Sequence, residues 1–199
     1  MTVKLVGSTS GSVSLQAPAS TTGGAHRVLT LPDADGTVAV GNTGKLLQVV
    51  QTVKTDVSSR GGSSGTDALV AISGLSVNIT PSATSIKIHV VVNIKQGVTS
   101  SAWVRYQLQR DSTAIYLGDT ASGKTPTSNF SYPGNDYGLS TVSENFLDSP
   151  NTTSQITYQV YWGVRTDSGR IAYINRTGYD QGDYAARTAS SITAMEIAA

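Results

Sequence analysis

The stretch SIKIHVVVNIK, residues 85 to 95, constrains the fold of this chain more than any other segment. Every second position is apolar: Ile86, Ile88, Val90, Val92 and Ile94. Polar side chains, among them Lys87, His89, Asn93 and Lys95, stand between them. Because successive side chains of a β-strand point to opposite faces, this alternation predicts a strand in a sheet with one buried and one solvated face.

Two later segments repeat this alternation. In residues 101 to 110 the predicted inward side chains are Val104, Tyr106 and Leu108, and the outward ones are Trp103, Arg105, Gln107 and Gln109. In residues 155 to 165 the predicted inward side chains are Ile156, Tyr158, Val160, Trp162 and Val164. Strands of this length with one apolar face are best satisfied by two antiparallel sheets packed face to face.

The remaining segments fit the same class. Strands are predicted in KLLQVVQTVKT from Lys45, in DALVAISGLSVNITPS up to Pro81, in RIAYINRTG and in the closing SSITAMEIAA, whereas SSRGGSSGTD at 58 to 67 reads as a flexible loop. Gly, Ser and Thr are abundant and Glu, Leu and Lys are scarce, which disfavours helices. We therefore predict an all-β protein, with an antiparallel β-sandwich or jelly-roll-like domain over residues 45 to 199.

Charge and cysteine content exclude several classes of function. The formal net charge is +1 and 14% of residues are charged, so no broad field favours nucleic acid or an anionic membrane. The chain has no cysteine, which removes disulfides and thiolate metal sites. No apolar run approaches the roughly 18 residues that span a bilayer. We expect a protein made in a cytoplasm, with no membrane insertion and no nucleic-acid partner.

The first 44 residues differ from the rest. Their alternating pieces, Val13 with Leu15 and Val28 with Leu29 and Leu31, are short and are interrupted by proline and paired glycine. Such pieces cannot close a core of their own. The segment is either a disordered arm or a set of strands that neighbouring chains complete.

Residues 118 to 125, GDTASGKT, match the nucleotide phosphate-binding pattern G-x-x-x-x-G-K-[ST]. In such a loop a helix follows the lysine at once, and its N-terminus faces the phosphates. Here PTSNFSYPGNDYG follows, which has almost no apolar periodicity and contains Pro133, Gly134 and Gly138. The better interpretation is a loop of a β-hairpin.

Other candidate chemistry is sparse. His26 and His89 lie in different regions, and with no cysteine they do not make a zinc site. Subunits of an oligomer could gather His89 around an axis and trap an ion, but a solvated or interface histidine is the more common case. The sequence marks no pair of acids as catalytic. We predict no catalytic residues, no metal and no cofactor.

Two polar, glycine-rich loops concentrate the aromatic residues that could bind a ligand. They contain Tyr132, Asn135, Asp136 and Tyr137 in the first loop and Tyr179, Asp180, Asp183 and Tyr184 in the second. An aromatic face packs against the C–H face of a sugar, and neighbouring carboxylates and amides take its hydroxyls. Tyrosines that cap strand ends look the same in sequence, so loop packing is the alternative.

Several segments resemble tail-fibre and other virion structural proteins of tailed bacteriophages, especially phages of cyanobacteria and marine bacteria. They are GSVSLQAPASTTGGAHRVLTLPDADGTVA (11 to 39), KLLQVVQTVKTD, GLSVNITPSATSIKIHVVVNI, RDSTAIYLGD (110 to 119), FLDSPNTTSQITYQV (146 to 160), YINRTG and SSITAMEIAA. The resemblance covers nearly the whole chain. Its motifs are structural, so it implies no catalytic residue.

The resemblance implies a homotrimer in the virion. Residues 1 to 44 would be an extended β arm for trimerisation and for attachment to other phage tail or baseplate proteins, and residues 45 to 199 a β-sandwich tip. Both faces of SSITAMEIAA carry apolar groups, so one face could pack against a neighbour. Three tips would bind a host surface glycan with avidity.

Two alternatives remain open at this point. The first is an architectural virion protein, such as a capsid decoration protein or a fibre adaptor, without receptor binding. The second is a polysaccharide-degrading tailspike, for which 199 residues without internal repeats are a poor match.

Overall fold

The computed structural model describes residues 2–6, 12–16, 46–62, 68–165 and 169–198. The chain divides into two compact units, residues 1–41 and 42–199. In the first unit, β1 (Thr2–Val6) and β2 (Ser12–Gln16) form a two-stranded antiparallel sheet. Val28, Leu29 and Leu31, which we expect three arms to bury together, lie outside the described residues.

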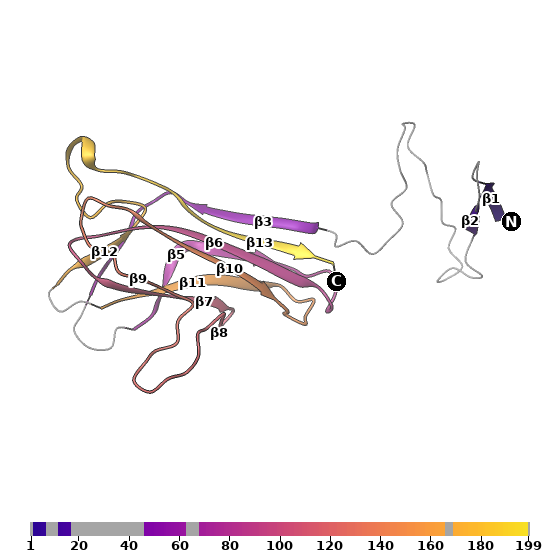
Figure 1. The fold of residues 1–199 in the computed structure, drawn as a ribbon, viewed down its shortest axis with the longest axis horizontal. Helices are drawn as coiled ribbons and strands as arrows, with labels where there is room; N and C mark the ends of the chain where they lie inside the picture. The colour runs from indigo at the N-terminus through magenta and orange to yellow at the C-terminus, as the bar shows by residue number, and fades with distance from the viewer. Residues whose placement is uncertain (1, 7–11, 17–45, 63–67, 166–168, 199) are drawn as a thin grey trace. The chain divides into compact units, whose positions relative to one another are not determined.

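The second unit is a sandwich of two antiparallel sheets (Figure 1). The first sheet contains β3 (Leu46–Lys54), β4 (Ser58–Gly61), β6 (Lys87–Val98), β10 (Ser140–Asp148), β12 (Ile171–Ile174) and β13 (Ser190–Ile197). The second contains β5 (Val70–Ile79), β7 (Trp103–Arg110), β8 (Thr113–Ile115), β9 (Asn129–Ser131) and β11 (Ile156–Arg165).

The order of the strands is that of a jelly roll. The long strand β6 pairs with β10 on one side and with β13 and then β12 on the other, and β13 pairs with β3. In the facing sheet β11 lies between β5 and β7, and β7 also pairs with β8 and β9. The first and last long strands of the unit are therefore neighbours, and the chain crosses repeatedly between the sheets.

The predicted all-β class and the antiparallel sandwich are confirmed, and the predicted inward side chains form the core. All five apolar positions of residues 85 to 95 are buried, as are the inward sets of β7 and β11. The described residues contain no α-helix, and therefore no helix long and apolar enough to cross a membrane. One prediction was partly wrong: residues 58–61, expected within a loop, form β4, because β12 offers them a backbone partner.

The strand β5 contains a bulge that the sequence did not mark. Its register against β11 shifts between Gln159 and Tyr161, and Gly74 adopts a positive φ of 78°, which glycine tolerates better than other residues. The Gln159 amide Nε2 donates to the carbonyl oxygens of Ile72 at 2.9 Å and Leu75 at 3.0 Å. This side chain replaces the ladder hydrogen bonds that the bulge removes.

A polar clamp connects the two sheets through their interior. Asp148 of β10 accepts two hydrogen bonds from Arg110 of β7, at 2.8 and 2.7 Å, and one from the Tyr158 hydroxyl of β11 at 2.6 Å. Burial and the Asp148 carboxylate raise the pKa of Tyr158, so this hydroxyl stays a proton donor. The clamp satisfies a buried carboxylate and fixes the alignment of the sheets.

Glu144 lies on β10 four residues before Asp148 and is also buried, but it has no hydrogen-bond partner among the described residues. Its side chain is only 2% exposed, and its carboxylate oxygens accept no hydrogen bond from a described residue. Burial raises its pKa from 4.5 to about 7. Between these two pH values the folded protein binds more protons at this site than the unfolded chain does, so its contribution to stability falls as the pH rises.

The substitution Glu144→Gln should remove this pH dependence. At pH 4 the variant and the wild type should have similar free energies of unfolding, and at pH 8 the variant should be more stable by roughly 1–3 kcal/mol, because no charge is buried. Denaturant unfolding from pH 4 to pH 8 measures the difference. Glu196→Gln is the control, since this carboxylate accepts hydrogen bonds from Ser82 N and Oγ and its loss should destabilise. A pH-independent difference between wild type and Glu144→Gln would contradict the prediction.

Candidate functional site

All eight predicted ligand-contact residues lie in two loops that the fold brings together. The first loop, residues 132–139, connects β9 to β10, and the second, residues 175–189, connects β12 to β13. The backbone N–H of Tyr179 donates to the carbonyl oxygen of Asp136 at 2.7 Å. The rings of Tyr137 and Tyr179 lie 4.9 Å apart, at 35° to each other. Tyrosines that are 42 residues apart in sequence thus form one aromatic surface, defined here as the tyrosine pair.

The first loop is shaped by an asparagine turn. Asn135 Oδ1 accepts hydrogen bonds from the backbone N–H groups of Tyr137 at 3.1 Å and Gly138 at 2.7 Å. A side chain that bonds the backbone two and three residues later makes a tight turn without a helix or strand. The amide oxygen of Asn135 therefore shapes the loop and presents Tyr137, whose side chain is 59% exposed.

The second loop is anchored at its base by Asn175, which is fully buried. Its Nδ2 donates to the carbonyl oxygens of Lys54 at 2.8 Å and Asp56 at 3.0 Å, and its Oδ1 accepts from Ser190 Oγ at 2.6 Å. Asn175 has a φ of 68°, a conformation that asparagine tolerates better than most residues. One amide thereby joins the end of β12 to β3 and to β13.

Two glycines let this loop lie directly against β6. A Cβ at Gly97 would be 2.3 Å from the carbonyl oxygen of Arg176, and a Cβ at Gly178 would be 1.9 Å from that of Val98. Both distances are far shorter than a van der Waals contact, so only glycine permits this approach of the two backbones. The position of Tyr179 follows from it, because Tyr179 is the next residue.

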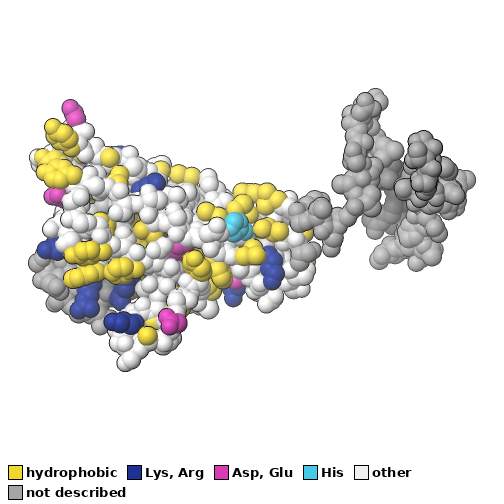
Figure 2. All heavy atoms as spheres, in the orientation of Figure 1, with side chains coloured by type: hydrophobic (Ala, Val, Ile, Leu, Met, Phe, Trp, Pro, Cys, Tyr) yellow, Lys and Arg dark blue, Asp and Glu magenta, His cyan; other side chains and the backbone are white. Residues whose placement is uncertain are grey.

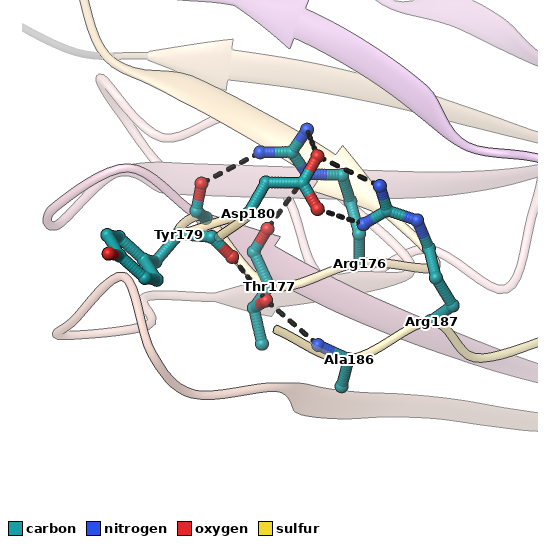
Figure 3. Close-up of polar contacts among 7 residues, drawn as sticks. Arg176, Thr177, Tyr179, Asp180, Ala186 and Arg187 are labelled. Atoms are coloured by element: carbon teal, nitrogen blue, oxygen red, sulfur yellow. Dashed lines mark hydrogen bonds and ion pairs between the residues drawn. The ribbon is translucent and has the colours of Figure 1, made fainter. Parts of the chain in front are cut away.

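Asp180 fixes the outer part of the second loop by pairing with two arginines of the same loop (Figure 3). Its carboxylate accepts from Arg176 Nη1 at 2.7 Å and from both Nη1 and Nη2 of Arg187. The Arg187 guanidinium, and then that of Arg176, lowers the pKa of Asp180 against a smaller opposing effect of burial. Arg176 also lies over the Tyr173 ring, 3.9 Å from its centroid. Figure 3 shows the Tyr179 ring directed away from this cluster, so Asp180 supports the loop on which Tyr179 is presented.

The remaining predicted residues lie in two places. Asp183 and Tyr184 belong to the short 3₁₀ helix η2 (Gly182–Tyr184) at the tip of the second loop, and Tyr184 is 78% exposed. Tyr132 does not join the tyrosine pair, because it stacks on Trp103 of β7 with ring centroids 5.3 Å apart. The eight residues therefore do not form one site. Glycan contact by any of them stays a prediction.

The GDTASGKT segment is a loop between β8 and β9, as expected. It is not the loop of a β-hairpin, because β8 and β9 each pair with β7 and not with each other. No helix follows Lys124 among these fully described residues, and the backbone N–H of Lys124 donates to Ala121 O at 3.0 Å within a turn. Gly118 N closes the loop by donating to Thr127 O at 3.2 Å. An amide that bonds its own turn does not face a phosphate, so the segment lacks the geometry of a nucleotide phosphate loop.

A second surface of interest lies on the outer face of the first sheet. The register places Val49, Met195, His89 and Leu147 side by side on β3, β13, β6 and β10, and directly paired residues share a face. Val49 is 52% and Leu147 is 54% exposed. With Leu47 and Ile197 these residues form what we define as the apolar patch. Figure 2 shows hydrophobic side chains gathered around the histidine on this face.

Sequence reasoning found part of this patch and missed part. The double-sided apolar character of SSITAMEIAA indicated Met195 and Ile197, which do lie opposite to the buried Ile192 and Ala194. The exposure of Leu147 and Val49 could not be inferred, because it depends on which strands flank β6 and β13. Among the described residues, no three histidine, aspartate or glutamate side chains gather as metal ligands would.

Comparison with known proteins gives little further information. No protein-family model and no curated protein matches the sequence. The structure resembles that of infectious bursal disease virus Gx strain, with a TM-score of 0.42 and 11% identity over 96% of this chain and 45% of that chain. It also resembles the VP2 subviral particle of infectious bursal disease virus, with a TM-score of 0.35 and 12% identity over 75% of this chain and 39% of that chain. The chain thus spans less than half of either protein, and TM-scores below 0.5 establish neither a shared family nor a shared function.

The substitution Gly178→Ala tests the anchoring of the second loop. The added methyl group must displace the Val98 carbonyl or the loop backbone, so we expect a loss of about 2 kcal/mol in the free energy of unfolding. Gly134→Ala is the matched control, because a Cβ there meets nothing within 4 Å and no loss is expected. Thermal unfolding of both variants measures the effect. Equal stabilities would mean that the close approach of the backbones does not constrain the loop.

Proposed function

We propose that this protein is a virion structural protein of the tail-fibre type, which assembles as a homotrimer and attaches the virion to a host surface glycan. The sequence resemblance to phage tail fibres supports the class. The observation that carries the proposal is the apolar patch. The sandwich buries the apolar groups on only one face of the first sheet and leaves those on the other face exposed. A second copy of the chain is the natural partner for such a surface in a homo-oligomer.

The composition of the patch suits a protein interface. Its centre is the row Val49, Met195, His89 and Leu147, and polar side chains flank it. One flank carries Lys87, whose ammonium donates to Ser149 Oγ at 2.6 Å, and another carries Asn145, which accepts from His89 Nε2. An apolar centre with a polar rim is the usual arrangement of association surfaces.

The tyrosine pair supports the attachment role. Tyr137 of this pair is largely exposed, as is Tyr184 at the tip of the second loop. Backbone contacts, Asn175 and Asp180 hold the two loops in place. Rigid loops with exposed aromatic faces suit the weak, repeated contacts that a trimer would multiply. We propose no enzymatic activity, because the loop carboxylates lie on exposed tips and Asp180 is committed to two guanidinium groups. The architectural role remains the alternative, and the same apolar patch supports it when it binds a different virion protein.

Light scattering of the purified full chain tests the assembly. We expect the mass of a trimer, and we expect Val49→Glu to shift the population toward monomer, because a charge would be buried at the interface while the folded monomer tolerates it at an exposed position. Leu117→Glu, at a loop side chain that is 42% exposed, is the control and should remain trimeric. A chain that begins at Lys45 shows how much the N-terminal segment contributes. A monomeric full chain would contradict the proposal.

A glycan array with the labelled full chain tests the attachment. Tyr137→Ala and Tyr179→Ala should each reduce the signal on the bound glycans by about tenfold, since each removes one face of the aromatic pair. Tyr116→Ala is a control for the loss of an exposed tyrosine elsewhere, because Tyr116 packs on Phe146. Glycan binding that is unchanged in both loop variants would leave these tyrosines with a packing role only.

A further inference from the structure

The outer face of the second sheet carries a pocket that neither the tyrosine pair nor the apolar patch includes. The register aligns Arg165 of β11 with Trp103 of β7, and Arg105 of β7 with Phe130 of β9. Directly paired residues share a face, so these four side chains stand together on the surface of the sheet. Gly163 lies opposite Arg105 on β11 and adds no side chain to this face. The four side chains and the gap above Gly163 form the floor of the pocket.

The wall of the pocket comes from the loop between β8 and β9. Lys124 and Thr125 line it together with the four sheet residues, and its volume is about 460 Å³. This volume lies within the range of roughly 300–1,000 Å³ that is usual for small-molecule sites. Three residues of the GDTASGKT segment, Gly123, Lys124 and Thr125, therefore line a pocket, although the segment is not a nucleotide phosphate loop.

The chemistry of the lining is cationic and aromatic. Arg105, Lys124 and Arg165 line the pocket, and among the described residues that line it none is acidic. The Trp103 side chain is 36% exposed, and Tyr132 stacks on it at an interplanar angle of 28°, which fixes the orientation of the indole. Guanidinium groups bind carboxylates and sulfates with paired hydrogen bonds, and an indole packs against the C–H face of a pyranose ring.

We propose that this pocket binds an acidic sugar unit, a pyranose that carries a carboxylate or sulfate group, within a polysaccharide. The ring lies on Trp103, the acidic group meets Arg165 and Lys124, and the Thr125 hydroxyl is available to the sugar hydroxyls. The proposal concerns a different surface from the tyrosine pair, and it holds for a monomer as well as for a trimer. It therefore does not rest on the proposed function.

Two other anionic ligands fit these residues less well. A nucleotide would place its phosphates at Lys124, but the amide of Lys124 bonds Ala121 and no helix N-terminus is present. A single-stranded nucleic acid needs a cationic groove that follows its backbone, whereas the formal net charge of the chain is only +1. One compact pocket with one exposed indole suits a single ring.

Isothermal titration calorimetry of the full chain tests the proposal with five probes. They are the tetramer of galacturonic acid, a sulfated tetrasaccharide, the tetramer of galactose, ATP and a short thymidine oligonucleotide. We expect saturable binding of one or both acidic sugars, at least about tenfold tighter than that of the neutral tetramer, because each charge-assisted hydrogen bond contributes about that factor. The two acidic probes distinguish a carboxylate ligand from a sulfate ligand. The affinity should fall as salt is added.

Variants locate the binding. Lys124→Gln and Arg165→Gln should each weaken binding of the acidic probe by about tenfold, and Trp103→Leu should weaken binding of acidic and neutral sugars alike. Lys95→Gln removes the same charge from the other sheet, where its ammonium donates to Thr141 Oγ1, and should bind as the wild type does. Each variant is first shown to keep the thermal unfolding midpoint of the wild type. If Trp103→Leu does not fold, Lys124→Gln and Arg165→Gln, both at exposed positions, still test the proposal.

Four results would overturn the proposal: no saturable binding of either acidic sugar, equal binding of the neutral tetramer, unchanged binding in Lys124→Gln and Arg165→Gln, or tighter binding of ATP or the oligonucleotide. The mass in solution and the glycan contacts of the tyrosine pair are measured separately on the same chain. A failure of the tail-fibre proposal is therefore distinguishable from a failure of this one.

Discussion

The burial of one apolar face from each of two sheets is the constraint on which the rest of the structure depends. Strands β6, β7 and β11 each contribute a row of apolar side chains at alternate positions, and the two sheets bury these rows against each other. Because the chain has no cysteine and its described residues form no α-helix, this packing is the main stabilising contact. The few buried polar groups, such as the Asp148 clamp, set how the two layers align.

Loop geometry follows from that packing through short-range polar and steric contacts. Asn175 ties the base of the second loop to two strands, and the glycines at 97 and 178 let its backbone lie on β6. Asp180 and two arginines then hold the outer part. The Asn175 amide and the Asp180 carboxylate thus bind groups of the protein itself, although in the sequence either could equally be a ligand contact. The second loop then presents the aromatic face of Tyr179 beside that of Tyr137 from the first loop.

The three surfaces of interest differ in chemistry and lie on different elements. The apolar patch covers β3, β13, β6 and β10, and its character favours association with another protein surface. The tyrosine pair lies on two loops, and the cationic pocket lies on β7, β9 and β11 under the GDTASGKT segment. This separation supports our proposal of an attachment protein, because in an enzyme the polar groups converge on one cleft.

The sequence by itself determined the fold class and the inward faces, because a period of two is a local property that survives in any sheet of this kind. It also showed that GDTASGKT is not followed by a helix. Only the tertiary structure decided which loops meet, that Tyr132 stacks on Trp103 while the Tyr137 ring lies tilted against that of Tyr179, and that Lys124 joins Arg165 in one pocket. Pairing between strands that are distant in sequence sets these neighbours, and alternation within one strand carries no information about which strand lies beside it.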